Sequence, residues 1–160
     1  MTATGLNHVS VVAQELATSI RFYAELFGAR PVPTPEFGYP VQWLAVGDAQ
    51  LHLFERPDRA PTYHHFALTV NDFEAVYARG RELGAFDADA FGHHLYELPG
   101  DVAQLYLRDP AGNLVEVDAP AASALPPPIR SELRRLADVH RQSPDNMRAR
   151  LALGSAGTPA

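Results

Sequence analysis

Two residue types are absent from this 160-residue chain, cysteine and lysine. Without cysteine there is no disulfide, no thiolate nucleophile and no cysteine-ligated zinc site. Without lysine there is no Schiff-base chemistry and no phosphate-binding P-loop, because both need that amine. All 13 basic residues are therefore arginines, and the net charge of −6 argues against general nucleic-acid binding.

Long apolar runs are lacking as well. No stretch approaches the roughly 18 residues that a membrane-spanning helix needs, and the N-terminus lacks the basic and apolar segments of a signal peptide. We therefore expect a cytoplasmic protein without a membrane partner. The length and the hydrophobic content of 46% allow one domain with a sizeable core.

An internal repeat organises the region from residue 5 to residue 118. In each half, a strand pattern that begins at a histidine (His8 or His65) leads into a helical pattern that ends near a glycine (Gly28 or Gly84). The apolar residues of both helical patterns recur at i, i+3, i+4 and i+7, which is typical of a helix with one buried face. The two halves therefore begin with the same supersecondary unit.

Strand patterns follow each expected helix. Alternating apolar residues predict the strands 41–46, 50–55, 94–98, 104–108 and 114–118. Asn71 with Glu74 resembles a capping box at the start of the second helix. Each repeat unit, about 5–56 and 62–118, is thus β-α-β-β-β, and the predicted class is α+β with one domain over 1–118.

Four polar residues occupy one kind of position in this pattern. His8, His52, His65 and Glu116 each lie on the strand side opposite to their apolar neighbours. His8 and His65 match between the first strands of the two halves, as His52 and Glu116 match between the last strands. If the halves pair by a pseudo-twofold axis, the four side chains converge. Two or three imidazoles and one carboxylate suit a divalent transition metal with open coordination positions.

The end of the chain has a different composition. Residues 119–128 are rich in proline and alanine and predict a linker. The pattern beyond predicts a helix over 129–141 within a helical extension spanning 129–153, and residues 154–160 are expected to be disordered. Six arginines and three acids follow Pro126, a net +3 that leaves −9 for the rest of a chain of total charge −6. The helix either docks on its own domain, which we favour, or covers a partner subunit or the pocket.

Four segments resemble the vicinal oxygen chelate superfamily: LNHVSVVAQELATSIRFYAELFGAR, LHLFE, HHFALTVNDFEAVYARGRELGA and YLRDPAGNLVEV. That superfamily includes glyoxalase I, extradiol dioxygenases, methylmalonyl-CoA epimerase, fosfomycin-thiol transferases and bleomycin-binding proteins. The resemblance implies two β-α-β-β-β modules that form one half-open, barrel-like mixed sheet. It places the family's metal ligands on His8, His65 and Glu116, and its fourth-strand position on His52, where glyoxalase I usually carries a carboxylate.

The resemblance also bears on reaction type. The spacing from Tyr106 to Glu116 resembles the tail of the extradiol dioxygenase signature, in which a histidine shortly before the tyrosine moves protons. His94 supplies that histidine here, at a longer gap. We expect one divalent metal, Fe(II) ahead of Mn, Ni, Co or Zn. His52 would be a fourth ligand or a general base, and Tyr106 and His94 would be catalytic groups.

Three functions follow from this ligand set. The first is a dioxygenase whose small-molecule substrate chelates the metal through vicinal oxygens, and the second is a glyoxalase-type isomerase, lyase or epimerase. The third is a protein that sequesters a drug or metabolite without catalysis. The retained ligands favour an enzyme, and the tyrosine pattern places the dioxygenase slightly ahead. We also expect a homodimer, because single-module relatives commonly pair and short sheets leave edges that need covering.

Overall fold

The structure is a computed structural model in which residues 2, 3 and 5–153 are described. Residues 154–160, where disorder was expected, lie outside the described residues. The chain forms two compact units. Unit 1 comprises Met1–His64 and Arg108–Asn113, and unit 2 comprises His65–Leu107 and Leu114–Ala160.

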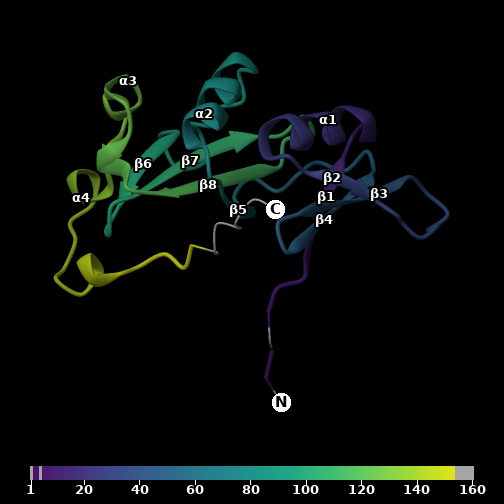
Figure 1. The fold of residues 1–160 in the computed structure, drawn as a ribbon, viewed down its shortest axis with the longest axis horizontal. Helices are drawn as coiled ribbons and strands as arrows, with labels where there is room; N and C mark the ends of the chain where they lie inside the picture. The colour runs from purple at the N-terminus through teal and green to yellow at the C-terminus, as the bar shows by residue number, and fades with distance from the viewer. Residues whose placement is uncertain (1, 4, 154–160) are drawn as a thin grey trace. The chain divides into compact units, whose positions relative to one another are not determined.

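Unit 1 contains the first β-α-β-β-β module. Its elements are β1 (His8–Ala13), α1 (Leu16–Phe27), β2 (Arg30–Val32), β3 (Val41–Val46) and β4 (Ala49–Glu55). The sheet has the order β1-β4-β3-β2, with β1 parallel to β4 and the other pairs antiparallel (Figure 1). A tight turn at Gly47, with a φ of 53°, joins β3 to β4 as the sequence predicts.

The core of unit 1 lies between α1 and this sheet. The helix buries Phe22, Tyr23 and Leu26, which lie on one face at helical spacing. Gly28 ends the helix in the left-handed conformation, with a φ of 63° and its N–H donating to the carbonyl of Ala24. The expected C-terminal glycine of this helix is therefore confirmed.

Unit 2 contains the second module. Its elements are β5 (His65–Thr69), α2 (Phe73–Glu82), β6 (Leu95–Leu98), β7 (Val102–Arg108) and β8 (Leu114–Pro120). The sheet order is β5-β8-β7-β6-β9, where β9 (Arg134–Arg135) belongs to the C-terminal extension. The strand β5 is parallel to β8, as β1 is to β4 in unit 1. The α+β class and the repeated β-α-β-β-β module are thus confirmed.

The start of α2 differs from the expected capping box. The N-cap is Asp72, whose side chain accepts a hydrogen bond from the backbone N–H of Ala75 at 2.9 Å. The expected cap at Asn71 with Glu74 is therefore wrong by one residue. An N-cap side chain accepts from the N–H two or three residues later, and Asp72 stands in that position relative to Ala75. Gly84 adopts a φ of 62° just after the helix, in the position expected for it.

The two faces of the unit 2 sheet differ in chemistry. On the face toward α2, Leu105, Leu107 and Val115 are fully buried, and Leu107 lies so close to Gly80 that an added Cβ would be 3.0 Å from it. Because strand side chains alternate, Tyr106 and Glu116 point to the opposite face. This opposite face carries the candidate site.

The structure of the C-terminal extension differs in two respects from what the sequence predicts. Its elements are a 3-10 turn (Ala122–Ala124), α3 (Pro127–Arg130), β9 (Arg134–Arg135), α4 (Leu136–Val139) and a second 3-10 turn (Asn146–Arg148). The single helix predicted over 129–141 is therefore wrong. Instead, β9 pairs in parallel with β6. Backbone N–H and C=O groups in this segment therefore form hydrogen bonds to β6 rather than within a helix. Residues 119–128 do not form an extended linker either, because β8 continues to Pro120 and the side chains of Ala122 and Leu125 are buried.

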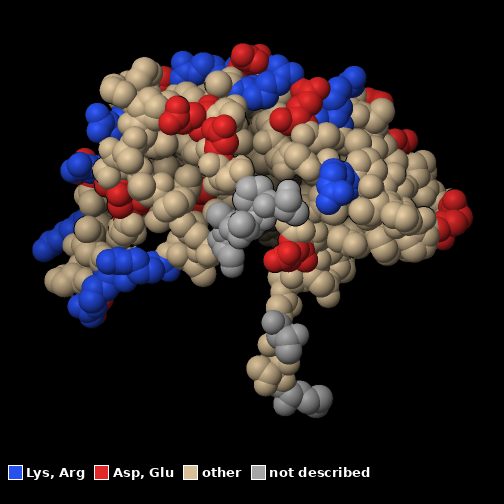
Figure 2. Space-filling model, viewed as in Figure 1, with Lys and Arg blue, Asp and Glu red and all other residues tan. Residues whose placement is uncertain are grey.

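The extension also carries much of the basic charge. Figure 2 shows blue side chains gathered over α3, α4 and the segment that follows, in agreement with the six arginines after Pro126. Within the described residues, no helix has the length and apolar character needed to cross a membrane.

Candidate metal centre

Unit 2 brings together two of the four expected ligands. In the parallel pairing of β5 with β8, Ala67 lies opposite Glu116, so His65 lies two residues earlier on the same face. The Nε2 atom of His65 is 3.3 Å from Oε2 of Glu116. Two ligand atoms at about 2.1 Å from one ion, with bond angles of about 90–109°, are roughly 3.0–3.4 Å apart. The spacing of this pair therefore fits two ligands of one transition metal.

Three polar residues surround Glu116 on the same buried face, and only Tyr106 was expected there. The Tyr106 hydroxyl donates to Oε1 of Gln104 at 2.7 Å, and Nε2 of Gln104 donates to Asp118 at 3.4 Å. Asp118 was missed, although it shares strand parity with Glu116 and the sequence therefore carried a signal for it. Glu116 and Asp118 are 5% and 2% exposed. Buried carboxylates are stable when a cation or a metal compensates them, so this pair favours a cation-binding site.

Burial and the charge of Glu116 raise the pKa of two neighbouring groups, Tyr106 and Asp118. Burial, followed by the charge of Glu116, raises the pKa of Tyr106 far above its usual value. The same two causes raise the pKa of Asp118. Tyr106 therefore keeps its proton at neutral pH and can act as a hydrogen-bond donor rather than as a base.

An aromatic side chain stands beside His65. The ring of Phe91 is 5.7 Å from the His65 ring in an edge-to-face contact and 4.6 Å from the Tyr106 ring. The Tyr96 hydroxyl donates to the carbonyl of Phe91 at 2.8 Å, which fixes the loop that carries the ring. Phe91 is nevertheless 41% exposed, so part of its surface faces solvent.

Unit 1 brings together the other two candidates, in a different geometry. On its sheet, β4 lies between β1 and β3, with Ser10 and Trp43 as the strand neighbours of His52. The His52 ring stacks on Trp43 at 4.2 Å and on His8 at 4.3 Å, with interplanar angles of 5° and 13°. His52 is thus the central ring of a row of three.

This stacking limits how both imidazoles could bind metal. The nitrogen lone pairs of an imidazole lie in its ring plane, so two nearly parallel stacked rings do not direct them at one ion. The Nε2 atom of His52 donates to Oε1 of Gln50 at 2.9 Å, which leaves Nδ1 with a lone pair. Burial, and then the charge of His8, lowers the pKa of His52, so the ring is neutral near pH 7. His52 in this arrangement fits a neutral base beside His8 better than a second ligand from the same unit.

A hollow of about 670 Å³ opens over this row of rings. The residues that line it are Asn7, His8, Ser10, Phe37, Trp43, Asp48, Gln50, His52 and Phe54. Five of these nine side chains are aromatic rings, counting the two imidazoles. Unit 1 therefore holds a ligand-sized space whose walls are mainly ring surface.

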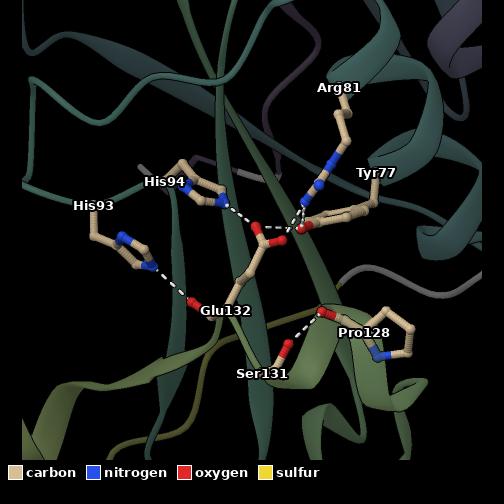
Figure 3. A network of polar contacts seen from close by, with 7 residues as sticks. All are labelled: Tyr77, Arg81, His93, His94, Pro128, Ser131 and Glu132. Carbon is tan, nitrogen blue, oxygen red and sulfur yellow. Dashed lines mark hydrogen bonds and ion pairs between the residues drawn. The ribbon is translucent and has the colours of Figure 1, made fainter.

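His94, expected as a catalytic group, lies elsewhere in unit 2. Its ring stacks on Phe86 at 4.7 Å, and its Nε2 is 3.2 Å from the carboxylate of Glu132 in the C-terminal extension. Figure 3 shows the same carboxylate bound by Tyr77 and Arg81 of α2. Because Phe86 packs against Gly80 of α2, His94 belongs to the helix-covered face and not to the face of Glu116. The structure thus places His94 in a network that attaches the extension.

The structure therefore assembles the candidates in pairs. Within residues 2, 3 and 5–153, no group of three or more His, Cys, Asp or Glu side chains is close enough to hold a metal ion. His8 lies with His52 in unit 1, and His65 lies with Glu116 and Tyr106 in unit 2. The complete ligand set stays a prediction, while the His65–Glu116 pair has the spacing of two ligands.

Known proteins show the same fold and sequence pattern. The sequence pattern of the "Glyoxalase/Bleomycin resistance protein/Dioxygenase superfamily" matches residues 5–117. "Glyoxylase I 4" of Arabidopsis thaliana is 28% identical over 125 residues, which cover 71% of this chain and 70% of that protein. The structure of "Oxidase ChaP-H1" is 29% identical, with a TM-score of 0.59, and the match covers 73% of this chain and 96% of that one.

A second similar structure contains a metal. It is a variant of the fosfomycin resistance protein FosX from Listeria monocytogenes, complexed with Mn(II) and 1S,2S-dihydroxypropylphosphonic acid. The identity is 16%, the TM-score is 0.60, and the match covers 76% of this chain and 96% of that one. At this identity the likeness concerns the fold.

Proposed function

Because the chain belongs to the glyoxalase/bleomycin resistance protein/dioxygenase superfamily, we propose that it is a metal-dependent enzyme whose substrate chelates one divalent metal through two adjacent oxygens. The observation that carries the proposal is the His65–Glu116 pair, with its two donor atoms 3.3 Å apart and Tyr106 beside it. His8 is the proposed third ligand, since it begins β1 as His65 begins β5. The Mn(II) in the FosX complex supports a metal of this class on this fold.

The donor set fits the metal. Neutral imidazole nitrogen and carboxylate oxygen are ligands for Fe(II), Mn(II), Co(II), Ni(II) and Zn(II), and three of them leave open positions. When bound, the metal supplies a Lewis acid that lowers the pKa of a chelating hydroxyl or enol. We propose Fe(II), consistent with the 2-His-1-carboxylate combination.

The chain's own residues would orient the substrate and move its protons. Tyr106 stays neutral because burial and Glu116 raise its pKa, so its hydroxyl is available as a donor to a substrate oxygen. His52 is neutral near pH 7 and keeps a lone pair on Nδ1, so it is available to accept a proton. His94 is no longer a candidate for this step, because the carboxylate of Glu132 and the ring of Phe86 hold it on the other face of the sheet.

Two reaction classes are proposed, in order. Oxidation with O₂ comes first, supported by Tyr106 beside the ligand pair and by the 29% identity to an oxidase. Glyoxalase-type isomerisation or lysis comes second, supported by the Arabidopsis relative but weakened by the histidine at position 52, where glyoxalase I usually has a carboxylate. A small molecule is the proposed partner in either case, and a homodimer remains a proposal.

Oxygen uptake tests this order. Protein loaded anaerobically with Fe(II) is mixed with a panel of catechols and hydroxyquinols, and O₂ consumption is followed with an electrode. We expect consumption that is lost in Glu116→Ala. Consumption equal to that of Glu116→Ala, together with turnover of a hemithioacetal or an epimerisable thioester, would reverse the order. Failure of both reactions in a protein that also binds no divalent metal would contradict the enzyme proposal.

A further inference from the structure

The C-terminal extension forms a second hollow, beside strand β6 of unit 2. Its volume is about 510 Å³, and its charged lining residues are Glu97 of β6, Arg130 of α3 and Arg135 of β9. We call it the extension hollow. Both guanidinium groups stay charged at any pH at which the protein is folded, and no further acid lines the hollow among the described residues. The extension hollow therefore carries a net positive charge.

The extension hollow lies on the face of the unit 2 sheet that α2 covers. Glu97 is paired with Ala103 across β6 and β7, and Ala103 shares strand parity with the buried Leu105 on that face. Figure 1 shows α3 on this same side of the sheet. Glu116 points to the opposite face. A molecule in the extension hollow is therefore separated from the candidate metal centre by the sheet itself.

The two guanidinium groups have unused hydrogen-bond donors. The Nε atom of Arg135 donates to Oε2 of Glu97 at 3.3 Å, and Nη1 of Arg130 donates to the carbonyl of Ser123 at 3.0 Å. Each guanidinium has several further N–H groups, and within residues 5–153 Arg130 has no carboxylate partner. Two positive groups that line one hollow repel each other. An anion bound between them would replace this repulsion by attraction.

Two serine hydroxyls also line the extension hollow, but their protons are donated to other groups. Oγ of Ser123 donates to the carboxylate of Asp101 at 2.8 Å, and Oγ of Ser131 donates to the carbonyl of Pro128 at 2.8 Å (Figure 3). The recognition of an anion therefore depends on the guanidinium groups. Their planar fork pairs with two oxygens of a phosphate or carboxylate at once.

The size and the other walls of the extension hollow indicate an organic anion. Ala122, Pro127 and Leu133 contribute apolar surface to the lining. A volume of about 510 Å³ leaves space beside the arginines for an apolar body as well as for the anionic group. A phosphate monoester carries a charge of about −1.5 to −2 near pH 7 and has three acceptor oxygens, so it matches two guanidinium groups better than a carboxylate does.

The charge distribution of the chain favours this place for an anion. The residues after Pro126 include six arginines and three acids, whereas the whole chain has a net charge of −6. Figure 2 shows the basic side chains gathered over α3 and α4. A negatively charged molecule is therefore repelled by most of the chain and attracted to the extension.

We propose that the extension hollow is a binding site for a small phosphate monoester with an apolar body, which Arg130 and Arg135 hold by its phosphate group. Glu97 competes with the ligand for Arg135 and limits the affinity. This site does not depend on the proposed function, because none of its lining residues belongs to the candidate metal centre.

Calorimetric titration of the full-length, metal-free protein with phenyl phosphate tests the proposal. Inorganic phosphate, which lacks the ring, and benzyl alcohol, which lacks the charge, are titrated for comparison. We expect saturable binding of phenyl phosphate, binding of inorganic phosphate that is at least about 5-fold weaker, and none of benzyl alcohol at the same concentrations. Absence of phenyl phosphate binding would overturn the proposal, as would equally tight binding of either comparison compound.

Charge variants identify the groups that bind. Arg130→Gln and Arg135→Gln should each weaken phenyl phosphate binding about 10-fold, since a hydrogen-bonded charge is lost. Arg148→Gln makes the same charge change in the same extension, at a side chain that is 73% exposed and does not line the hollow, and should weaken binding less than about 2-fold. Glu97→Gln should have the opposite effect and tighten binding about 2- to 5-fold, because it removes a repulsive charge.

The variants also define what contradicts the site. Equal losses in Arg130→Gln, Arg135→Gln and Arg148→Gln would show that only net charge acts, and would overturn it. Weaker binding in Glu97→Gln would do the same, and this variant keeps both arginines if an arginine variant does not fold. Circular dichroism of each variant detects unfolding.

Glu116→Ala distinguishes this site from the candidate metal centre. We expect this variant to bind phenyl phosphate as the wild type does, because the sheet lies between Glu116 and the extension hollow. A loss of phenyl phosphate binding in Glu116→Ala would place the ligand on the metal-binding face and overturn the proposal. Failure of the protein to bind Mn(II) in a separate titration would contradict the proposed function and leave this site unaffected.

Discussion

The two units place their candidate residues on equivalent strands, but the side chains form different chemical groups. In unit 2, an imidazole and a buried carboxylate lie 3.3 Å apart, with a second buried carboxylate nearby. In unit 1, two imidazoles stack in a row on an indole. The β-α-β-β-β module thus determines where these side chains stand, and the residue types determine what each place can do. We therefore propose that the metal binds mainly through unit 2, whereas unit 1 contributes a row of stacked rings.

The largest expected effect tests the metal-binding role of unit 2. Replacing Glu116 by Ala or His65 by Ala removes one of the two proposed, adjacent ligand atoms. Divalent metal affinity should then fall by at least about 100-fold, since the loss of groups that only support the ligands already costs about 10- to 100-fold. Calorimetric titration with Mn(II) measures the change. Glu97→Gln, on strand β6 of the same sheet and paired with Arg135, is the control and should bind metal normally. Equal metal affinity in Glu116→Ala and wild type would contradict the proposal that unit 2 binds the metal.

The next effect concerns turnover with the metal retained. Tyr106→Phe removes a hydroxyl that burial and Glu116 keep protonated, so a hydrogen-bond donor is lost from the site. We expect turnover to fall roughly 10- to 100-fold, at the low end of what proton-handling side chains contribute, with metal content unchanged. Loss of metal from this variant would show instead that Tyr106 supports the ligands. Gln104→Leu, which removes the acceptor of the Tyr106 hydroxyl, should have a smaller effect on turnover.

A third experiment tests whether the two units contribute unequally to metal binding. In His52→Ala, metal affinity should fall by no more than about 10-fold, the low end of the range for residues that do not bind the metal directly. The reason is that the stacked rings of His8 and His52 do not direct their nitrogens at one ion. A loss as large as in His65→Ala would make His52 a full ligand. The same variant should show reduced turnover if His52 accepts a proton.

The smallest effect concerns the extension, which unit 2 carries and unit 1 does not. Hydrogen bonds from Arg81 and Tyr77 lower the pKa of Glu132 to about 2. A carboxyl whose pKa is lowered by folding stabilises the protein above its unfolded pKa of about 4.5, and this contribution is lost as the pH falls toward 2. Glu132→Gln should therefore lower Tm at pH 7, by no more than about 4 °C because the pair is partly exposed. The difference from wild type should shrink between pH 4.5 and 2.

Differential scanning calorimetry at several pH values measures this change. Asp145→Asn provides the control, since its ion pair with Arg148 is local and both side chains are highly exposed. A Tm difference for Glu132→Gln that is independent of pH would show that the carboxylate does not attach the extension through its charge.

Much of the fold could be predicted from local sequence patterns. Strict alternation around His65 and Glu116 assigned each side chain to the strand side opposite its apolar neighbours, because the period of a strand is two residues. The helices over Leu16–Phe27 and Phe73–Glu82 followed from apolar spacing and from the glycines that end them. The helix predicted over 129–141 was wrong, because part of this segment pairs with the edge of β6 instead of forming helical hydrogen bonds. A local sequence pattern cannot show that a distant strand edge is free to pair.

The sequence alone therefore determined the module, its repetition and the side of each strand on which the candidate residues stand, because these depend on neighbours a few residues away. Only the tertiary structure decided which of those residues touch. It paired His65 with Glu116, stacked His52 between Trp43 and His8, and placed His94 on the carboxylate of Glu132. Such contacts join positions that are 9 to 51 residues apart in the chain, where distance depends on strand order and packing rather than on periodicity.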